Sequence, residues 1–518
     1  MKPDPIELEL FRHLLISVAE EMGTVLRKTS FSANIKERRD YSCAVYDPMG
    51  RTVAMGDHMP VHLGAMPLSV QQVQEAFDLR AGDVAIVNDP FRGGTHLPDI
   101  TAVTAVFVKG SAKPAFFVAN RAHHADVGGM SPGSMPMARE IYQEGIRIPP
   151  VLLVRRGKVD RQLLDLVLAN VRTPYEREGD ILAQWMSLKR GQERLQAIVA
   201  KYGLRRVHRN LEHLLDYSER MMRAAIGRLP EGVYRFEDFL DSDGICPKPV
   251  KIAVSITLQG SGAKVDFSGS DPQAEGPVNA NYAIAVAATM YVFRCLIRED
   301  VPFTQGLMRP IQVIAPEGTV VNAKAPAAMA AGNVETSQRI TDVLLGALAQ
   351  AAPDEIPAAS SGTMNNLSFG GWDPRRNRAF AYYETIAGGM GASARADGWS
   401  ATHTHMTNSW NTPIEALEHL YPVRVRRYQI RRGSGGKGLH CGGNGIEREL
   451  EFLAAADVTI LSDRRQRGPY GLCGGSAGAP GRNLLDGAPL EGKTTFRVAP
   501  GSRLLILTPG GGGWGEVK

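Results

Sequence analysis

Apolar residues recur every four positions near the start of the chain, at Ile6, Leu10, Leu14, Val18 and Met22. This spacing predicts an amphipathic helix with one buried stripe. From residue 41 to about 129 the pattern changes to short apolar runs that end in turn residues, which indicates strands. The predicted strands are 43–46, 84–87, 101–108 and 115–119. We expect the last two to pair as a hairpin, because a Lys-Gly-Ser turn lies between them.

Helical periodicity dominates the next part of the chain. It runs through 163–171, 181–201 and 207–226, and Gly203 and Gly227 interrupt it, so we expect a helical hairpin there. Short strands return after Pro230, and later segments carry further helix and strand patterns. The later helices are predicted over 283–297 and 336–351, and the later strands over 250–258, 263–267, 423–430 and 447–453.

These elements predict an α+β protein of several subdomains. The expected regions are an α/β part with a metal site over 1–155, a helical hairpin over 156–230, a mixed part over 231–420, and a β-rich, glycine-rich part over 421–518. A chain of 518 residues is too long for one hydrophobic core, which favours two or three packed units.

Composition excludes several classes of protein. The net charge of +5 is spread along the chain, so nucleic acid is not implied as a partner. The five cysteines include no CxxC pair, which argues against a zinc ribbon and a disulfide framework. The N-terminus has no apolar signal core, and the longest apolar run, near 282–296, is interrupted by Arg294. We therefore expect a cytoplasmic protein without a membrane segment.

The segment 88–99 has the most promising chemistry. His96 and Asp99 follow a Gly-Gly bend and precede a predicted strand. An imidazole and a carboxylate three positions apart can share one side of a turn, and together they suit Zn, Mn or Fe. The alternative is a plain turn in which Asp99 accepts a hydrogen bond from a backbone amide and His96 is a polar surface residue.

The segment 120–129 strengthens the metal interpretation. The predicted hairpin would bring residues 120–126 back to the level of 96–99. His123 and His124 are adjacent in a strand, so they point to opposite faces and only one should join the site. Asp40 begins a strand of the same region, and it is either an ion-pair partner of nearby basic residues or a fourth ligand.

Other histidines and glycines give weaker signals. His58 and His62 flank Pro60, which excludes a helical metal motif, so we interpret both as loop or wall residues. His403 and His405 would share one face of a strand, as pocket or structural residues. The run 433–438 lacks Walker A spacing and is interpreted as a hairpin turn, so the chain is predicted to have no nucleotide site.

Taken together, these motifs resemble the hydantoinase B/oxoprolinase family. The resemblance rests on Glu-Arg-Arg-Asp-Tyr-Ser at 37–42 and on the segments 88–99 and 120–129. Further matches are Glu-Gly-Ile-Arg-Ile-Pro-Pro at 144–150, Asp-Phe-Ser-Gly at 266–269 and the glycine-rich ending around Trp514.

The resemblance implies a subunit of an ATP-dependent cyclic amidase, such as an N-methylhydantoinase, a 5-oxoprolinase or a lactamase. Its obligate partner would be a hydantoinase A-type subunit with an actin-like ATPase fold. The metal ligands that it implies are His96, Asp99 and His123, with Asp40 as a plausible fourth. The interval of 27 between His96 and His123 looks slightly longer than usual, which leaves His124 open as the alternative.

We expect the partner to phosphorylate the amide oxygen, and this chain to open the activated ring with divalent metal. Asp40 or Asp126 would take the proton, and Arg92 or Arg121 would steady the phosphate. Assembly into a heterotetramer or a higher multiple is expected. One alternative is a subunit of an ATP-dependent ketone carboxylase of the acetone or acetophenone type, and another is a non-catalytic scaffold.

Overall fold

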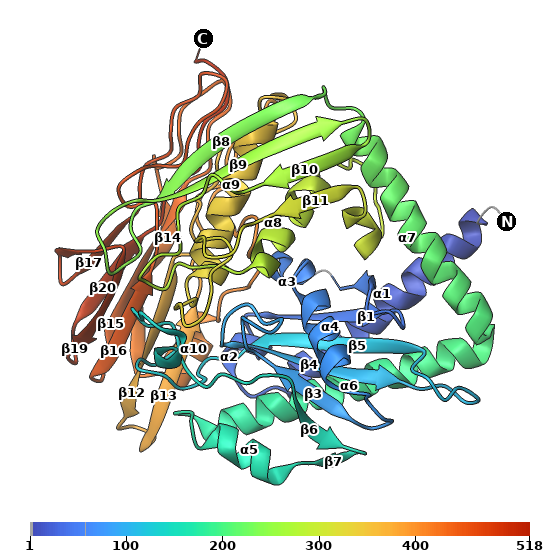
Figure 1. The fold of residues 1–518 in the computed structure, drawn as a ribbon. Coiled ribbons are helices and arrows are strands. Elements are labelled where there is room, and N and C mark those ends of the chain that lie inside the picture. The colour runs from blue at the N-terminus through green and yellow to red at the C-terminus, as the bar shows by residue number, and fades with distance from the viewer. Residues whose placement is uncertain (1–3, 57, 518) are drawn as a thin grey trace.

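The computed structural model describes residues 4–56 and 58–517, which form four β-sheets and the helices between them (Figure 1). The α+β class predicted from the sequence is confirmed. The first sheet is antiparallel throughout, in the order β2-β1-β5-β4-β3-β6-β7. Its strands are β1 (Tyr41–Tyr46), β2 (Thr52–Met55), β3 (Val84–Val87), β4 (Asp99–Val106), β5 (Phe116–His123), β6 (Val151–Arg155) and β7 (Lys158–Val159). The predicted hairpin of β4 and β5 is therefore confirmed.

Helices cover both faces of this sheet. Because side chains alternate along a strand, Cys43 and Val45 pack toward α1 (Pro5–Thr29) and α6 (Pro174–Tyr202). Ala44 and Tyr46 pack toward α4 (Met66–Ala76) on the opposite face. The first sheet is thus buried on both faces.

The helix predicted at the start of the chain is confirmed as α1, and Val18 and Met22 of the expected stripe are buried. The expected stripe is wrong at its start, where Ile6 and Leu10 are exposed.

The shorter helices near this sheet are α2 (Ala33–Lys36), α3 (Pro60–Leu63), η1 (Ile141–Gln143) and α5 (Arg161–Leu168). Helix α7 (Leu204–Ile226) follows α6 after Gly203, whose φ of +80° is a conformation that favours glycine. The two helices meet there and diverge in Figure 1, so that α7 leads to the second sheet.

The second sheet has the order β11-β10-β9-β8. Its strands are β8 (Gly232–Leu240), β9 (Val250–Gln259), β10 (Gly262–Asp266) and β11 (Ile311–Ile314), and only the β10–β11 pair is parallel. Every second residue of β9 is buried, against α8 (Tyr282–Cys295) and α9 (Ser337–Leu348). The helix expected over 336–351 begins at Ser337, because the residues before it form the π turn η3 (Gly332–Thr336). The 3-10 turn η2 (Gln305–Met308) precedes β11.

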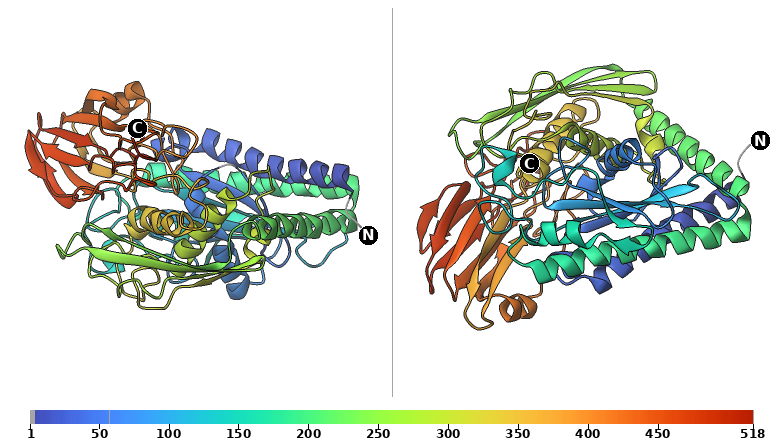
Figure 2. Two further views of the ribbon diagram at one scale, coloured as in Figure 1. Left: turned by 90° about the horizontal axis from the view of Figure 1, so that it is seen from above. Right: turned by 60° about the horizontal axis from the view of Figure 1, so that its bottom comes forward.

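Two antiparallel sheets pack together at the C-terminal end (Figure 2), and α10 (Ile414–Leu420) contributes Leu417 to their shared core. One has the order β13-β12-β16-β19, from β12 (Asn366–Asp373), β13 (Arg378–Glu384), β16 (Ala456–Leu461) and β19 (Lys493–Val498). The other has the order β14-β15-β20-β17-β18, from β14 (Val423–Arg431), β15 (Gly445–Phe452), β17 (Arg482–Leu485), β18 (Ala488–Leu490) and β20 (Arg503–Leu507). The predicted pairing of 423–430 with 447–453 is confirmed, and the run 433–438 lies in their connection.

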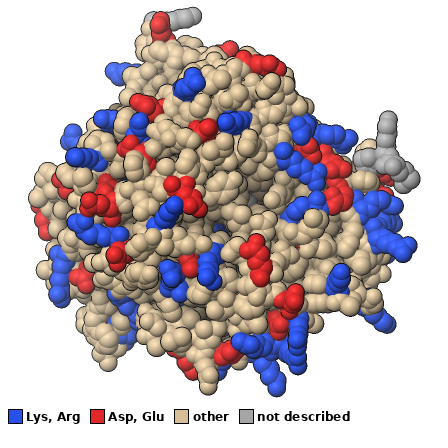
Figure 3. Space-filling view, in the orientation of Figure 1, with Lys and Arg blue, Asp and Glu red and all other residues tan. Residues whose placement is uncertain are grey.

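One prediction about the later segments is wrong. His403 and His405 do not lie on a strand, because His405 has a φ of +58° that takes the chain out of the extended conformation. None of the helices in the described part of the chain is long and apolar enough to cross a membrane. On the face in Figure 3, basic and acidic side chains are interspersed rather than gathered by sign.

Candidate metal centre

Three potential metal ligands meet at the end of the β4–β5 hairpin. Asp99 is the first residue of β4 and pairs directly with His123, the last residue of β5. His96 lies in the loop before β4, where Gly93 has a φ of +87° and turns the chain back. Each of the three offers a ligand atom, and these atoms all lie within 4.8 Å of one another.

The three side chains are buried and their ligand atoms converge. Asp99 Oδ1 lies 3.2 Å from His96 Nε2 and 3.3 Å from His123 Nδ1, yet it has no hydrogen-bond partner. His96 Nδ1 lies 3.1 Å from the carbonyl of Ala330, which can only accept, so Nδ1 donates and Nε2 presents its lone pair to Asp99. A buried carboxylate oxygen without a donor, between imidazole nitrogens, suits a divalent cation. The donor set therefore fits the metal expected from the sequence.

Charge also favours a cation. Burial would raise the pKa of Asp99, but the neighbouring imidazoles of His96, His62 and His123 hold that pKa well below its usual range. Burial lowers the pKa of His123, which keeps that ring neutral and able to act as a ligand. The centre thus combines an ionised carboxylate with an uncharged imidazole.

His62 belongs to this centre, although its sequence context indicated a loop or wall residue. Its Nε2 lies 3.3 Å from Asp99 Oδ2, and its Nδ1 lies 2.9 Å from Ser42 Oγ. Pro60 is the first residue of α3, and this short helix places His62 beside Asp99 at the start of β4. The sequence prediction correctly excluded a helix across Pro60 but missed the contact.

Asn333 was also missed. Its amide nitrogen lies 3.1 Å from His96 Nε2 and 3.3 Å from Asp99 Oδ2, while its buried Oδ1 has no partner. It lies in the π turn η3, and such turns are frequent at functional sites. In the sequence it lies before the helix expected over 336–351, and nothing there links it to residues 237 and 234 positions away.

A second layer of side chains fixes His123. Tyr383 stacks on its ring, with centroids 4.3 Å apart and planes 15° apart. Tyr383 Oη donates to Asn366 Oδ1 at 2.8 Å, and Asn34 Nδ2 donates to the His123 carbonyl at 2.6 Å. Arg38 Nη1 donates to the Tyr383 carbonyl at 3.1 Å. The hairpin end is therefore tied to β13.

His124 and Asp40 take different places around the hairpin. His124 Nε2 lies 3.1 Å from Gln184 Oε1 of α6, on the face of β5 opposite the centre. The alternation expected for adjacent strand residues is therefore observed, with His123 inward. Asp40 is buried, and its carbonyl accepts from the His123 amide at 3.0 Å. It is not one of the three clustered ligands, but its charge acts on His123.

The other predicted site residues have structural contacts. Asp126 accepts from the Gly128 amide and from both the amide and Nη1 of Arg172, each at 3.0 Å, and thus closes a loop. Arg121 is buried and donates to Thr101, Thr95 and Ser69, whereas Arg92 is exposed. Of these side chains, Arg121 comes nearest the centre, through the Thr95 hydroxyl that also donates to Asp99 Oδ2 at 3.0 Å.

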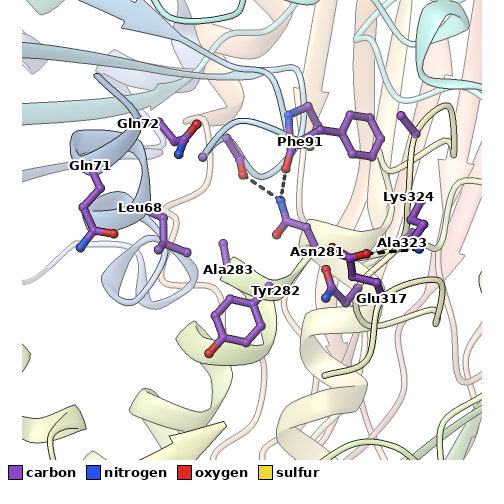
Figure 4. Close-up of a pocket in the computed structure, with 15 residues that line it drawn as sticks. Leu68, Gln71, Gln72, Phe91, Asn281, Tyr282, Ala283, Glu317, Ala323 and Lys324 are labelled. Atoms are coloured by element: carbon purple, nitrogen blue, oxygen red, sulfur yellow. Dashed lines mark hydrogen bonds and ion pairs between the residues drawn. The ribbon is translucent and has the colours of Figure 1, made fainter. Parts of the chain in front are cut away.

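A pocket of about 580 Å³ lies behind the loop that carries His96 (Figure 4). It is lined by Leu68, Gln71 and Gln72 of α4 and by the start of α8. Asn281 donates to the carbonyls of Pro90 and Gly94 at 2.8 Å each, and so holds the loop in place. Pro90, Phe91, Gly93 and Gly94 of this loop line the pocket, whereas none of the three clustered ligands does.

Comparison with known proteins identifies relatives along the whole chain. A family described as Hydantoinase B/oxoprolinase matches residues 4–517. The chain is 41% identical to an uncharacterized protein of Methanocaldococcus jannaschii, over 99% of this chain and 91% of that protein. It is 32% identical to a putative D-/L-hydantoinase subunit of a Pseudomonas species, over 99% and 90%. It is also 38% identical to 5-oxoprolinase 1 of Arabidopsis thaliana, over 99% of this chain but 42% of that protein.

Solved structures show the same architecture. An ATP-dependent caprolactamase from Pseudomonas jessenii matches with a TM-score of 0.92 and 30% identity, over 100% of this chain and 92% of that one. A nucleotide-free acetone carboxylase matches with a TM-score of 0.88 and 19% identity, over 99% and 76%. The second match shows a shared fold alone.

Proposed function

The chain belongs to the hydantoinase B/oxoprolinase family, and on that premise we propose that it is the metal-dependent subunit of an ATP-dependent cyclic amidase. Its substrate would be a hydantoin, 5-oxoproline or a lactam, activated by phosphorylation of the amide on an actin-like, hydantoinase A-type ATPase partner. The observation that carries the proposal is the buried cluster of His96, Asp99 and His123. The ketone carboxylase alternative is supported by a shared fold alone.

His96, Asp99 and His123 would hold the divalent cation, Zn, Mn or Fe. When bound, such a cation acts as a Lewis acid and makes nucleophilic oxygen available at neutral pH. Neighbouring residues hold these ligands in the orientation that binding needs. The Ala330 carbonyl fixes the tautomer of His96, and stacked Tyr383 fixes the ring plane of His123.

Asp40 is proposed as the proton acceptor or as a further ligand, because it is buried and its charge acts on His123. Arg121 and Asp126 are better explained as positioning residues, since neighbouring groups already satisfy their side chains. Exposed Arg92 remains a proposal for contact with the phosphate that the partner supplies. The partner is proposed to be obligate, in a heterotetramer or a higher multiple.

The experiment compares His96→Ala and His123→Ala with His124→Gln, each co-expressed with a hydantoinase A-type subunit. His124 is the matched control because it is adjacent in sequence and faces α6. We expect the two alanine variants to lose bound metal, measured by plasma mass spectrometry, and to lose ATP-dependent opening of a cyclic-amide panel. Full metal content and turnover in both alanine variants would exclude the proposed centre.

A further inference from the structure

A second pocket of about 410 Å³ lies among α8, residues 355–360 and residues 399–408. Pro60 contributes to its wall, and two residues further along α3 His62 lies 3.3 Å from Asp99 Oδ2. The same short helix therefore forms part of the pocket wall and part of the candidate metal centre.

A second connection runs through Arg38, which is fully buried. Arg38 Nη2 donates at 3.0 Å to the Oγ of Ser409, the residue that follows the pocket-lining segment 399–408. Arg38 Nη1 donates to the carbonyl of Tyr383, the residue that stacks on His123. The pocket and the candidate centre thus share their supporting residues on two sides.

Two of the histidines that line the pocket, His403 and His405, carry ring nitrogens without hydrogen-bond partners. Both ring nitrogens of His403 are buried without a hydrogen-bond partner, and so is Nε2 of His405. Nδ1 of His405 lies 3.4 Å from Tyr291 Oη. Buried polar atoms without partners are costly, so a ligand that pairs with them gains the hydrogen bonds that the protein leaves unmade.

The protonation state of these rings defines the ligand. Burial and the charge of Arg38 lower the pKa of His403 to about 3, and burial lowers the pKa of His405. A neutral imidazole has one donor and one acceptor. A secondary cyclic amide has the complementary pair, an N–H that donates and a carbonyl that accepts.

The remaining lining is nearly free of charge. Among the described residues that line the pocket there is no lysine or arginine, and the carboxylate of Glu355 is bound by Arg298 at 2.5 Å. Leu296, Leu345 and Ile356 supply apolar surface. A ring that carries a carboxylate would find no lysine or arginine among the described lining residues to pair with, and Arg298 is already bound to Glu355.

We propose that this pocket binds the ring of the substrate, and that the ring is a neutral cyclic amide, such as a lactam without a carboxylate, recognised by His403 and His405. This inference rests on the proposed function and narrows its substrate class. It gives a role to two histidines that the metal centre does not use.

The test measures binding of 2-pyrrolidinone and of 5-oxoproline to the full chain, without ATP or partner. These probes have the same five-membered lactam ring and differ by one carboxylate. Trp399 lines the pocket and is 73% exposed, so its fluorescence reports binding. Trp399→Phe should abolish the fluorescence change, whereas Trp372→Phe, at an exposed tryptophan on β12, should leave it intact.

We expect 2-pyrrolidinone to bind at least about tenfold more tightly than 5-oxoproline, because an unpaired carboxylate is costly to bury. His403→Leu should weaken binding of 2-pyrrolidinone by about tenfold without unfolding the protein, since neither ring nitrogen of His403 makes a hydrogen bond in the described chain. His419→Leu, at an exposed histidine on α10, is the matched control.

Equal or tighter binding of 5-oxoproline would overturn the neutral substrate class. A fluorescence change that persists in Trp399→Phe, unchanged affinity in His403→Leu, or no binding of either probe would overturn the pocket assignment. Because the assay needs neither ATP nor turnover, these failures are distinct from failure of ATP-dependent ring opening in the co-expressed pair.

Discussion

Glu144 is a buried carboxyl that should make stability fall at high pH. Its Oε1 accepts from the amides of Met329 and Ala330 at 2.7 and 2.9 Å, while its Oε2 is buried without a partner. Burial raises the pKa of Glu144 to about 8 from 4.5, although the two amides oppose the shift. The folded chain therefore binds this proton more tightly than the unfolded chain, so the stabilisation is complete below pH 4.5 and is lost as pH rises through 8.

The perturbation is Glu144→Gln, which keeps an oxygen for both amides and cannot ionise. One pKa unit corresponds to about 1.4 kcal/mol, so the cost of ionising Glu144 reaches about 5 kcal/mol above pH 8. Thermal unfolding of parent and variant, measured by scanning fluorimetry from pH 5 to pH 9, checks this. We expect the difference between the Tm of the variant and the Tm of the parent to increase by several degrees in favour of the variant as pH rises across this range.

Exposed Glu415 on α10 gives the matched control, because Glu415→Gln changes the same group in solvent and should show no such trend. A Tm difference for Glu144→Gln that stays constant from pH 5 to pH 9 would refute the reasoning. So would a variant that becomes less stable than the parent as pH rises.

Three further predictions concern the centre and the packing around it. Asn333→Ala should weaken metal binding by about tenfold in a chelator competition, because a contact to His96 and Asp99 is lost, and unchanged affinity would contradict this. Removing the metal by dialysis against chelator should lower Tm, with recovery when Zn, Mn or Fe returns, and a Tm indifferent to metal would count against the centre. Gly511→Ala should destabilise the chain strongly, since its Cβ would lie 2.0 Å from the Met390 carbonyl; a Tm within a degree of the parent would show that the backbone adjusts.

Local patterns predicted much of the N-terminal fold correctly. The four-residue spacing of apolar positions indicated α1, and the two apolar runs around a turn indicated the β4–β5 hairpin. That hairpin brings Asp99 opposite His123, and strand alternation directs His123 and His124 to opposite faces. These features depend on neighbours in sequence, so the sequence alone was sufficient.

Contacts between distant segments could not be predicted in this way. His62 reaches Asp99 because α3 turns it inward, and Asn333 lies on a π turn just before the helix that the sequence predicted. The strand expected around His403 failed because no local signal marks the left-handed backbone at His405. The roles of Asp40, Arg92, Arg121 and Asp126 remain predictions.

The central claim is that His96, Asp99 and His123 hold a divalent cation. Anomalous diffraction from crystals of the chain purified with its co-expressed partner, recorded at the absorption edge of the metal found in the sample, tests it most directly. The account predicts an anomalous difference peak among these three side chains. An anomalous peak at another site, or none in crystals of an active preparation, would contradict it.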